Sequence, residues 1–192
     1  MSMEPTKRTD RRRLTHVDRA GRPRMVDVST KPVTARRAVA EAEVGVEQAT
    51  ISIIVDGGGP KGDVLTVAEL AGVMGAKRTS DLIPLCHPIP LTEVVVEVRP
   101  DRTRSAILVR ASAATVAQTG VEMEALTAAA VAALTVYDMV KGVDRSAEIR
   151  HLRVIEKSGG RSGDWRRAAD QPVAEGAKAA RPRGVRGPRR SG

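Results

Sequence analysis

The sequence predicts one domain that combines β-strands with α-helices. Strands are indicated by two-residue alternation in residues 34 to 46 and by two apolar runs, residues 91 to 98 and 104 to 113. Helices are indicated by two longer segments with cap signals, residues 63 to 80 and 121 to 141. A chain of 192 residues has the length of a single domain with tails.

The formal net charge of +9 is concentrated at the two ends of the chain. Residues 1 to 13 carry five Lys and Arg against two acids, residues 164 to 192 carry eight against three, and residues 14 to 163 keep only +1. With one Trp, one Tyr and no Phe, the chain also lacks an aromatic platform for stacked bases. These counts argue against a nucleic-acid-binding body. We expect basic, disordered tails at residues 1 to 13 and 164 to 192 around a catalytic domain at residues 14 to 163.

The cellular compartment is indicated by the cysteine count and by the lack of a signal-like or membrane-spanning apolar segment in the sequence. One Cys allows no internal disulfide, and the basic N-terminal residues precede no apolar signal segment. The longest apolar run, residues 125 to 140, is interrupted by Asp138 and is shorter than the ~20 residues that span a bilayer. We therefore expect a cytoplasmic protein.

The first strand, residues 34 to 46, has a small-residue face. That face is formed by Ala38, Ala40, Ala42, Val44 and Val46. Arg36 begins the same face and is either a strand-end side chain that reaches solvent or an anion ligand. Residues 47 to 55 then predict a short helix whose inward side chains are Ile51, Ile54 and Val55.

A glycine-rich loop, Gly57-Gly58-Gly59-Pro60, leads to Lys61. It is not a P-loop, because Lys61 is followed by Gly62-Asp63 instead of Ser or Thr. The next helix is capped either by Asp63 or by Thr66 with Glu69 in a capping box. Its predicted buried stripe consists of Val64, Val67, Ala68, Ala71 and either Met74 or Gly75.

Residues 82 to 90 carry three prolines and predict an irregular, rigid segment. His87 precedes a proline, which holds its backbone extended, so the segment resembles the wall of a site more than a linker. Cys86 is more often a buried small side chain than a nucleophile. A second histidine, His16, is either an exposed loop residue or a site residue.

The helix predicted at residues 121 to 141 is apolar on nearly every side, which predicts a subunit interface along it. Asp138 is its only charge between Glu124 and Lys141. Asp138 and Lys141 form either an ordinary surface ion pair or an acid and amine in apolar surroundings, where they would be suited to proton transfer.

A last strand at residues 146 to 155 precedes a Gly-Gly turn. Lys157 and Arg161 flank Gly159 and Gly160. Backbone N–H groups in such a turn form an anion nest, although the same composition suits a flexible exit into the tail.

Together these motifs resemble a known family. They are LTHVD with MVDVS, DGGGPKGDV, AKRTSDLIPLCHP, TGVEMEALTAAAVAALTVYDMVKGVD and KSGGRSG. In this order they resemble the cyclic pyranopterin monophosphate synthase (MoaC) family of molybdenum cofactor biosynthesis. The resemblance covers about residues 16 to 163. Arg161 stands where the family pattern has lysine, which keeps the charge and changes the donor geometry.

The resemblance implies an α+β fold, a ferredoxin-like antiparallel β-sheet packed against two long α-helices. It also implies a homohexamer, a trimer of dimers with the active site at the dimer interface. The implied activity is that of a lyase, which converts (8S)-3',8-cyclo-7,8-dihydroguanosine 5'-triphosphate to cyclic pyranopterin monophosphate and pyrophosphate.

The resemblance further implies which residues form the site. The catalytic residues would be Asp138, Lys61 and Lys141. The substrate-binding residues would be Leu85, Cys86, His87, Met123, Glu124, Arg36, Lys31, His16 and Lys157. These residue types suit the reaction, because cations and turn amides meet a triphosphate while amines and a carboxylate move protons. We expect no redox cofactor and no metal-ligand cluster, which leaves Mg²⁺ accompanying the triphosphate as the one metal to consider.

Overall fold

The computed structural model describes residues 16–17, 20–56 and 62–168. Lys61, the N-terminal tail and most of the C-terminal tail lie outside these ranges.

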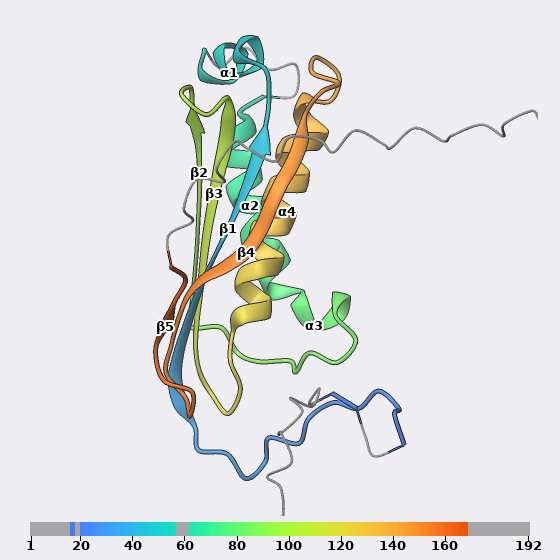
Figure 1. Ribbon diagram of the computed structural model, residues 1–192, viewed down its shortest axis with the longest axis vertical. Helices are drawn as coiled ribbons and strands as arrows, with labels where there is room; N and C mark the ends of the chain where they lie inside the picture. The colour runs from blue at the N-terminus through green and yellow to red at the C-terminus, as the bar shows by residue number, and fades with distance from the viewer. Residues whose placement is uncertain (1–15, 18–19, 57–61, 169–192) are drawn as a thin grey trace, which may run out of the picture.

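The described residues form a sheet with helices on one side of it (Figure 1). The strands are β1 (Thr34–Gly45), β2 (Glu93–Asp101), β3 (Ala106–Ala117), β4 (Glu148–Ser158) and β5 (Trp165–Arg166). All neighbours pair antiparallel, in the order β2-β3-β1-β4-β5. The first four strands interlock as two split βαβ units, which is the ferredoxin-like arrangement. The predicted α+β fold is confirmed, and β5 is an addition that the sequence patterns did not reveal.

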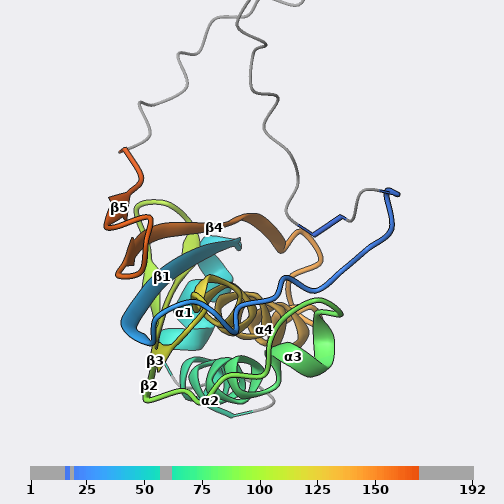
Figure 2. The same ribbon diagram turned by 90° about the horizontal axis from the view of Figure 1, so that it is seen from below.

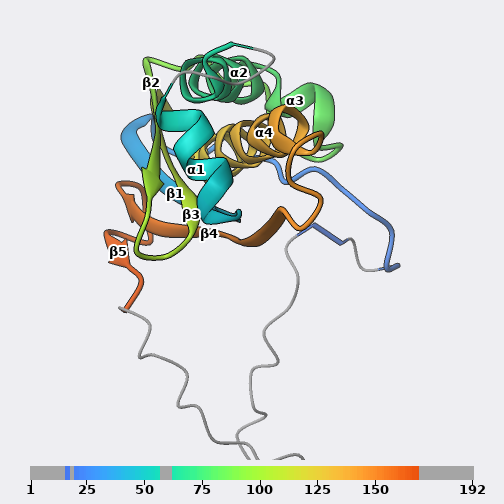
Figure 3. The same cartoon turned by 90° about the horizontal axis from the view of Figure 1, so that it is seen from above.

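The helices are α1 (Gln48–Val55), α2 (Val64–Lys77), α3 (Thr79–Leu82) and α4 (Glu122–Val140). Helix α4 packs on β1 and β3, and α2 lies beside it against β2 (Figure 2). The short helix α1 covers the far end of the sheet, where β2 turns into β3 (Figure 3).

The predicted small-residue face of β1 is buried against α4. Ala38, Ala40, Ala42 and Val44 are almost fully buried, and each pairs with a buried apolar residue of β3. Alanines on α4 meet them from the other side, so helix and sheet approach closely without large side chains between them. By length and composition alone α4 could cross a membrane, yet over half of it is buried in this core.

Helix α2 approaches α4 through glycine, and here the predicted stripe was partly wrong. Val67 and Met74 are exposed, whereas Gly72 and Gly75, the predicted alternative to Met74, face α4. A Cβ added at Gly75 would lie 2.8 Å from a methyl of Val131, closer than side chains pack. The short separation of the two helices therefore selects the glycine face over the face with larger side chains.

The start of α2 and the inward side of α1 were both predicted from local sequence. Asp63 is the N-cap of α2, as predicted, and accepts hydrogen bonds from the N–H groups of Leu65 (3.0 Å) and Thr66 (3.1 Å). The alternative capping box is wrong, because Glu69 instead accepts the backbone N–H of Val98 on the edge strand β2 at 3.0 Å. Val55, predicted to face inward, is half exposed at the end of α1.

Gly75→Val should destabilise the fold by about 1 to 3 kcal/mol, because the added methyls overpack the contact between α2 and α4. The unfolding midpoint in urea measures this. Leu70→Val on the exposed face of the same helix is the control, since it adds a β-branched residue without a clash. Equal midpoints for the two variants would contradict the close approach.

Candidate active site

Helix α4 holds the predicted site residues in two clusters at its opposite ends. Glu124 lies in its first turn and Asp138 in its last. They are fourteen positions apart along the helix, a rise of about 21 Å. We call the group around Arg36, Cys86, His87, Glu124 and Lys157 the binding cluster, and Asp138 with Lys141 the acid–amine cluster.

Within the binding cluster, Arg36 is anchored by backbone carbonyls at the start of the sheet. Its side chain follows the buried row of β1 and donates to the carbonyl oxygens of Ala117 (3.0 Å) and Gln118 (3.2 Å). Lys157, on the neighbouring strand β4, donates to Glu122 in the first turn of α4 at 3.0 Å. The sheet and the start of α4 thus place two cations side by side.

The Gly-Gly turn lies directly against Arg36. Gly159 and Gly160 have φ angles of +84° and +71°, which favour glycine. A Cβ on Gly159 would collide with the carbonyl of Ala35, and a Cβ on Gly160 with the Arg36 guanidinium. Asp164 already accepts the N–H of Gly159 at 3.2 Å, so the turn holds a carboxylate of its own chain. An ordered turn with an anion on its amide supports the nest interpretation over the flexible exit.

A cavity of about 660 Å³ opens beside this turn, within the range of ligand pockets. Lys31, Arg36 and Arg161 line it together with Ser162 and the Gly160 backbone. Its cationic lining and size suit an anion as large as a triphosphate.

The wall of the binding cluster is formed by the proline-rich segment and the first turn of α4. The Cys86 thiol donates to Glu124 Oε1 at 3.5 Å, and the Glu124 side chain is almost completely buried. Burial and the nearby Glu124 carboxylate raise the pKa of Cys86 to about 11, so this thiol is not an activated nucleophile. Burial likewise raises the pKa of Glu124, whose Oε2 is buried with no hydrogen-bond partner.

The remaining predicted binding residues differ in exposure. Leu85 is half-buried beside Cys86, and Met123 is exposed on α4. His87 is half-buried, and its Nε2 lies 2.8 Å from the carbonyl oxygen of Val26. His16 lies in an exposed turn, where its carbonyl accepts the N–H of Arg24 at 2.9 Å.

At the acid–amine cluster, the structure departs from the expected apolar surroundings. Lys141 Nζ and Asp138 Oδ1 are 2.7 Å apart, and both side chains are 55% exposed. The hydrogen bond and charge of Asp138 raise the pKa of Lys141. The pair faces outward because α4 turns its alanines, not Asp138, toward the sheet. In a single chain this is a surface ion pair, which contributes little to stability.

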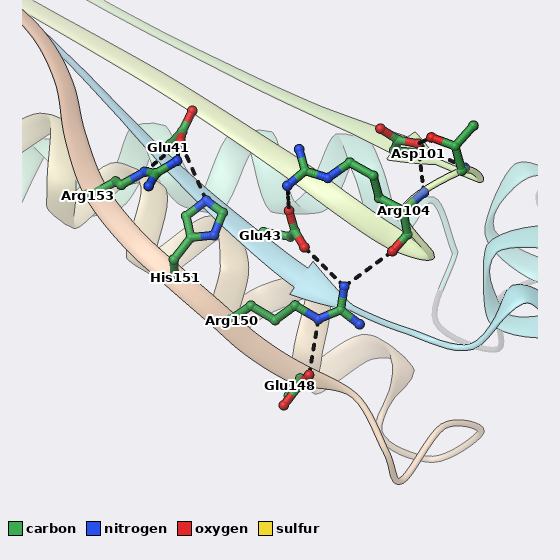
Figure 4. Close-up of polar contacts among 9 residues, drawn as sticks. Glu41, Glu43, Asp101, Arg104, Glu148, Arg150, His151 and Arg153 are labelled. Atoms are coloured by element: carbon green, nitrogen blue, oxygen red, sulfur yellow. Dashed lines mark hydrogen bonds and ion pairs between the residues drawn. The ribbon is translucent and has the colours of Figure 1, made fainter. Parts of the chain in front are cut away.

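Two other charged regions lie on the open side of the sheet, and the second of them borders the binding cluster at Lys157. The Glu43 carboxylate is buried between Arg104 and Arg150, and Glu41 pairs with Arg153 and His151 (Figure 4). This network ties β1 to its two neighbouring strands, with acids and bases neutralising each other.

The second region is a cavity of about 360 Å³ beside Trp165, lined also by Arg37, Glu156 and Arg166. Arg37 pairs with Glu93 (3.6 Å) and Arg166 with Glu156 (3.1 Å). Because Arg37 and Arg166 are already paired with carboxylates, this cavity is less suited to a polyanion than the cavity beside Arg36.

Two residues of the site were missed by the sequence reasoning. Glu122 holds Lys157, and Asp164 occupies the Gly159 amide. Glu122 could not be singled out as a site residue from the sequence, because an acid in the first turn of a helix is common. An acid directly after the Gly-rich motif was the available signal for Asp164.

The fold and these clusters define a class of protein: an α+β domain with a cationic cavity whose lining suits an anionic ligand. The comparisons agree with this class and narrow it. A family model described as the MoaC family matches residues 25–160. The chain is 58% identical over 153 residues to the cyclic pyranopterin monophosphate synthase of Brucella ovis, covering 80% of this chain and 93% of that protein.

It is also 56% identical over 158 residues to the synthase of the same name from Thermomicrobium roseum, covering 82% of this chain and 95% of that protein. The chain therefore belongs to the MoaC family.

Cys86 is the only cysteine, so its alkylation rate reports on this wall alone. With a pKa of about 11, roughly a thousandth of the thiol is ionised at pH 8, and iodoacetamide should react slowly. Glu124→Gln removes the neighbouring charge, lowers the pKa and should speed alkylation severalfold. Glu122→Gln, which loses a carboxylate paired with Lys157, is the control. Equal rates for the two variants would contradict the Cys86–Glu124 contact.

Proposed function

We propose that this protein catalyses the formation of cyclic pyranopterin monophosphate, with release of pyrophosphate, from a cyclised dihydro-GTP. The observation that carries the proposal is the convergence of Arg36, Lys157 and the Gly159–Gly160 turn beside a triphosphate-sized cavity in a member of the MoaC family. The activity belongs to molybdenum cofactor biosynthesis and is that of a lyase.

In this proposal the binding cluster takes the triphosphate and the ring system. Arg36, Lys31 and Lys157 meet the phosphate oxygens, and the same cations stabilise the departing pyrophosphate. The wall formed by Leu85, Cys86, His87, Met123 and Glu124 contacts the rest of the substrate. His16, exposed in its turn, joins this set on the family resemblance alone.

Asp138, Lys141 and Lys61 perform the proton transfers in this proposal. Opening the purine-derived ring and closing the pterin ring move protons at C–N bonds, which requires a carboxylate and amines. The 2.7 Å contact between Asp138 and Lys141 supports a proton-sharing pair. Lys61 belongs to the set by motif and lies outside the described residues.

One chain holds these two groups too far apart to act on one substrate molecule. The rise of about 21 Å between Glu124 and Asp138 is longer than the distance over which one bound nucleotide could contact both groups. We therefore propose a composite site in a two-fold dimer, in which the acid–amine cluster of one copy faces the binding cluster of the other. Covering Asp138 and Lys141 in this way would also provide the low dielectric that proton transfer needs.

The surface of α4 supports this arrangement. Met123, Leu134 and Tyr137 are exposed on its outward side, and the half-buried Leu126 and Ala130 lie between them at helical spacing. Leu134 is 57% exposed and Tyr137 38%, which is unusual for an otherwise buried helix. Antiparallel packing of two such stripes places each Asp138 end beside the partner's Glu124 end.

A second stripe supports a larger assembly. Val67, Leu70 and Met74 are exposed along α2. Two separate apolar faces on one subunit suit a hexamer built from three dimers. The expected cytoplasmic location also belongs to the proposal and is supported by the lone, unpaired Cys86. The proposed chemistry uses no redox cofactor, and Mg²⁺ would enter only with the triphosphate.

Asp138→Asn should keep substrate binding and lower product formation by about 10²- to 10⁴-fold, the usual contribution of a general acid or base. The assay supplies the cyclised dihydro-GTP and measures pyrophosphate release and, after oxidation, pterin fluorescence. Glu156→Gln on the open sheet face is the control for a lost carboxylate. Near-normal turnover by Asp138→Asn would exclude its proposed role, and absence of turnover by the unmodified protein would exclude the activity.

Mixing two inactive variants tests the composite site. Asp138→Asn and Arg36→Ala each disable a different end, so a mixed dimer keeps one intact site. Random exchange of subunits should therefore restore about a quarter of the full activity. Co-expression with two affinity tags isolates the mixed species. A verified mixed dimer with no activity would contradict a site shared between chains.

A further inference from the structure

Residues 24 to 33, which we call the strap, cross the end of the molecule that carries the binding cluster. The strap runs from the Val17–Pro23 bridge to the start of β1 and passes over the first turn of α4 (Figure 2). Its own turn is closed by two hydrogen bonds, from Lys31 N to Val28 O and from Ser29 N to Asp27 Oδ1, each 2.9 Å.

Two side chains hold the strap against the body. His87 Nε2 lies 2.8 Å from the Val26 carbonyl oxygen, and Gln118 Nε2 donates to the Ser29 carbonyl oxygen at 3.1 Å. His87 comes from the proline-rich wall and Gln118 from the end of β3. Both hold a backbone carbonyl, so the sequence of the strap gave no sign of either contact.

The His87 contact determines the form of its ring. A carbonyl oxygen only accepts hydrogen bonds, so Nε2 must carry the proton. Nε2 is therefore committed to the strap, and a neutral His87 has only Nδ1 left for a substrate, as an acceptor. His87 thus holds the strap in addition to lining the wall.

The strap in turn forms one side of the anion cavity. Thr30, Lys31 and Pro32 line it, opposite Arg36 and Gly160. The Lys31 backbone belongs to the strap, which is hydrogen-bonded to the body at Val26 and Ser29. His87 itself does not line this cavity.

We propose that His87 is a positioning residue for the anion cavity: by holding Val26 it places Lys31 opposite Arg36, and so strengthens triphosphate binding without touching the phosphates. This inference rests on the proposed function of the cavity. A net hydrogen-bond contribution corresponds to a change in affinity of about threefold to tenfold.

The test uses the full chain with inorganic triphosphate as the probe. His87→Ala should weaken triphosphate binding about threefold to tenfold in calorimetry, and should speed hydrogen exchange of backbone amides in residues 24 to 33. His87→Gln, whose side-chain amide can donate to the Val26 carbonyl, should restore both. Lys31→Ala should weaken binding while leaving strap exchange unchanged, which separates lost charge from lost position.

A second variant guards against an effect limited to His87. Gln118→Ala removes the other contact and should loosen the strap in the same way, while its backbone carbonyl still accepts from Arg36. Urea midpoints identify any variant that is globally unfolded.

Unchanged strap exchange in His87→Ala would overturn the proposal, and so would faster exchange with unchanged triphosphate affinity. Failure of His87→Gln to restore either quantity would also count against it. The exchange measurement needs no ligand. If the unmodified protein does not bind triphosphate, the proposed function of the cavity fails and the coupling fails with it, while the hold on the strap is still decided by exchange.

Discussion

Contact between helix α4 and the alanine face of β1 and β3 is the constraint on which the rest of the structure depends. Small side chains on both surfaces let the helix lie close to the sheet, and glycine lets α2 lie close to α4. This packing fixes the rotation of α4 about its axis. It turns the alanines inward and leaves Leu134, Tyr137 and Asp138 outward.

That rotation leaves Asp138 and Lys141 exposed in a single chain. A helix of 19 residues separates the acid–amine pair from the cationic cavity, and the sheet beneath it cannot bend to close the gap. An exposed ion pair between Asp138 and Lys141 has little catalytic use in water, where its field is screened. The apolar stripe on α4 and the separation of the two clusters are the observations behind the proposed second copy, which would lie antiparallel across the helix.

Charge at the binding end is organised by the backbone as much as by side chains. Arg36 is held by two carbonyls, the Gly159–Gly160 turn fits only because it lacks side chains, and His87 holds the strap through a carbonyl. Long cationic side chains lose considerable conformational entropy when they bind a ligand. Anchoring Arg36 and the strap beforehand removes part of that cost, which would be an advantage in the proposed binding of a flexible triphosphate.

The sequence by itself determined the family and most of the elements, but not α3 or β5. Alternation predicted β1, the apolar runs predicted β2 and β3, Asp63 predicted the start of α2, and the ordered motifs predicted the MoaC resemblance. These features depend on neighbours within a few residues or on long sequence motifs, so they can be recognised from the sequence alone.

Only the tertiary structure decided which faces of α2 and α4 are buried and which residues of separate elements meet. A helix that is apolar on nearly every side does not specify its own rotation, so the exposure of Asp138 had to come from packing against the alanine sheet. Glu69 does not cap its own helix but accepts a hydrogen bond from Val98, 29 residues away. His87 contacts Val26, 61 residues away, through a backbone carbonyl oxygen, which every residue possesses. No local pattern encodes such contacts, because they arise where separate elements are brought together in space.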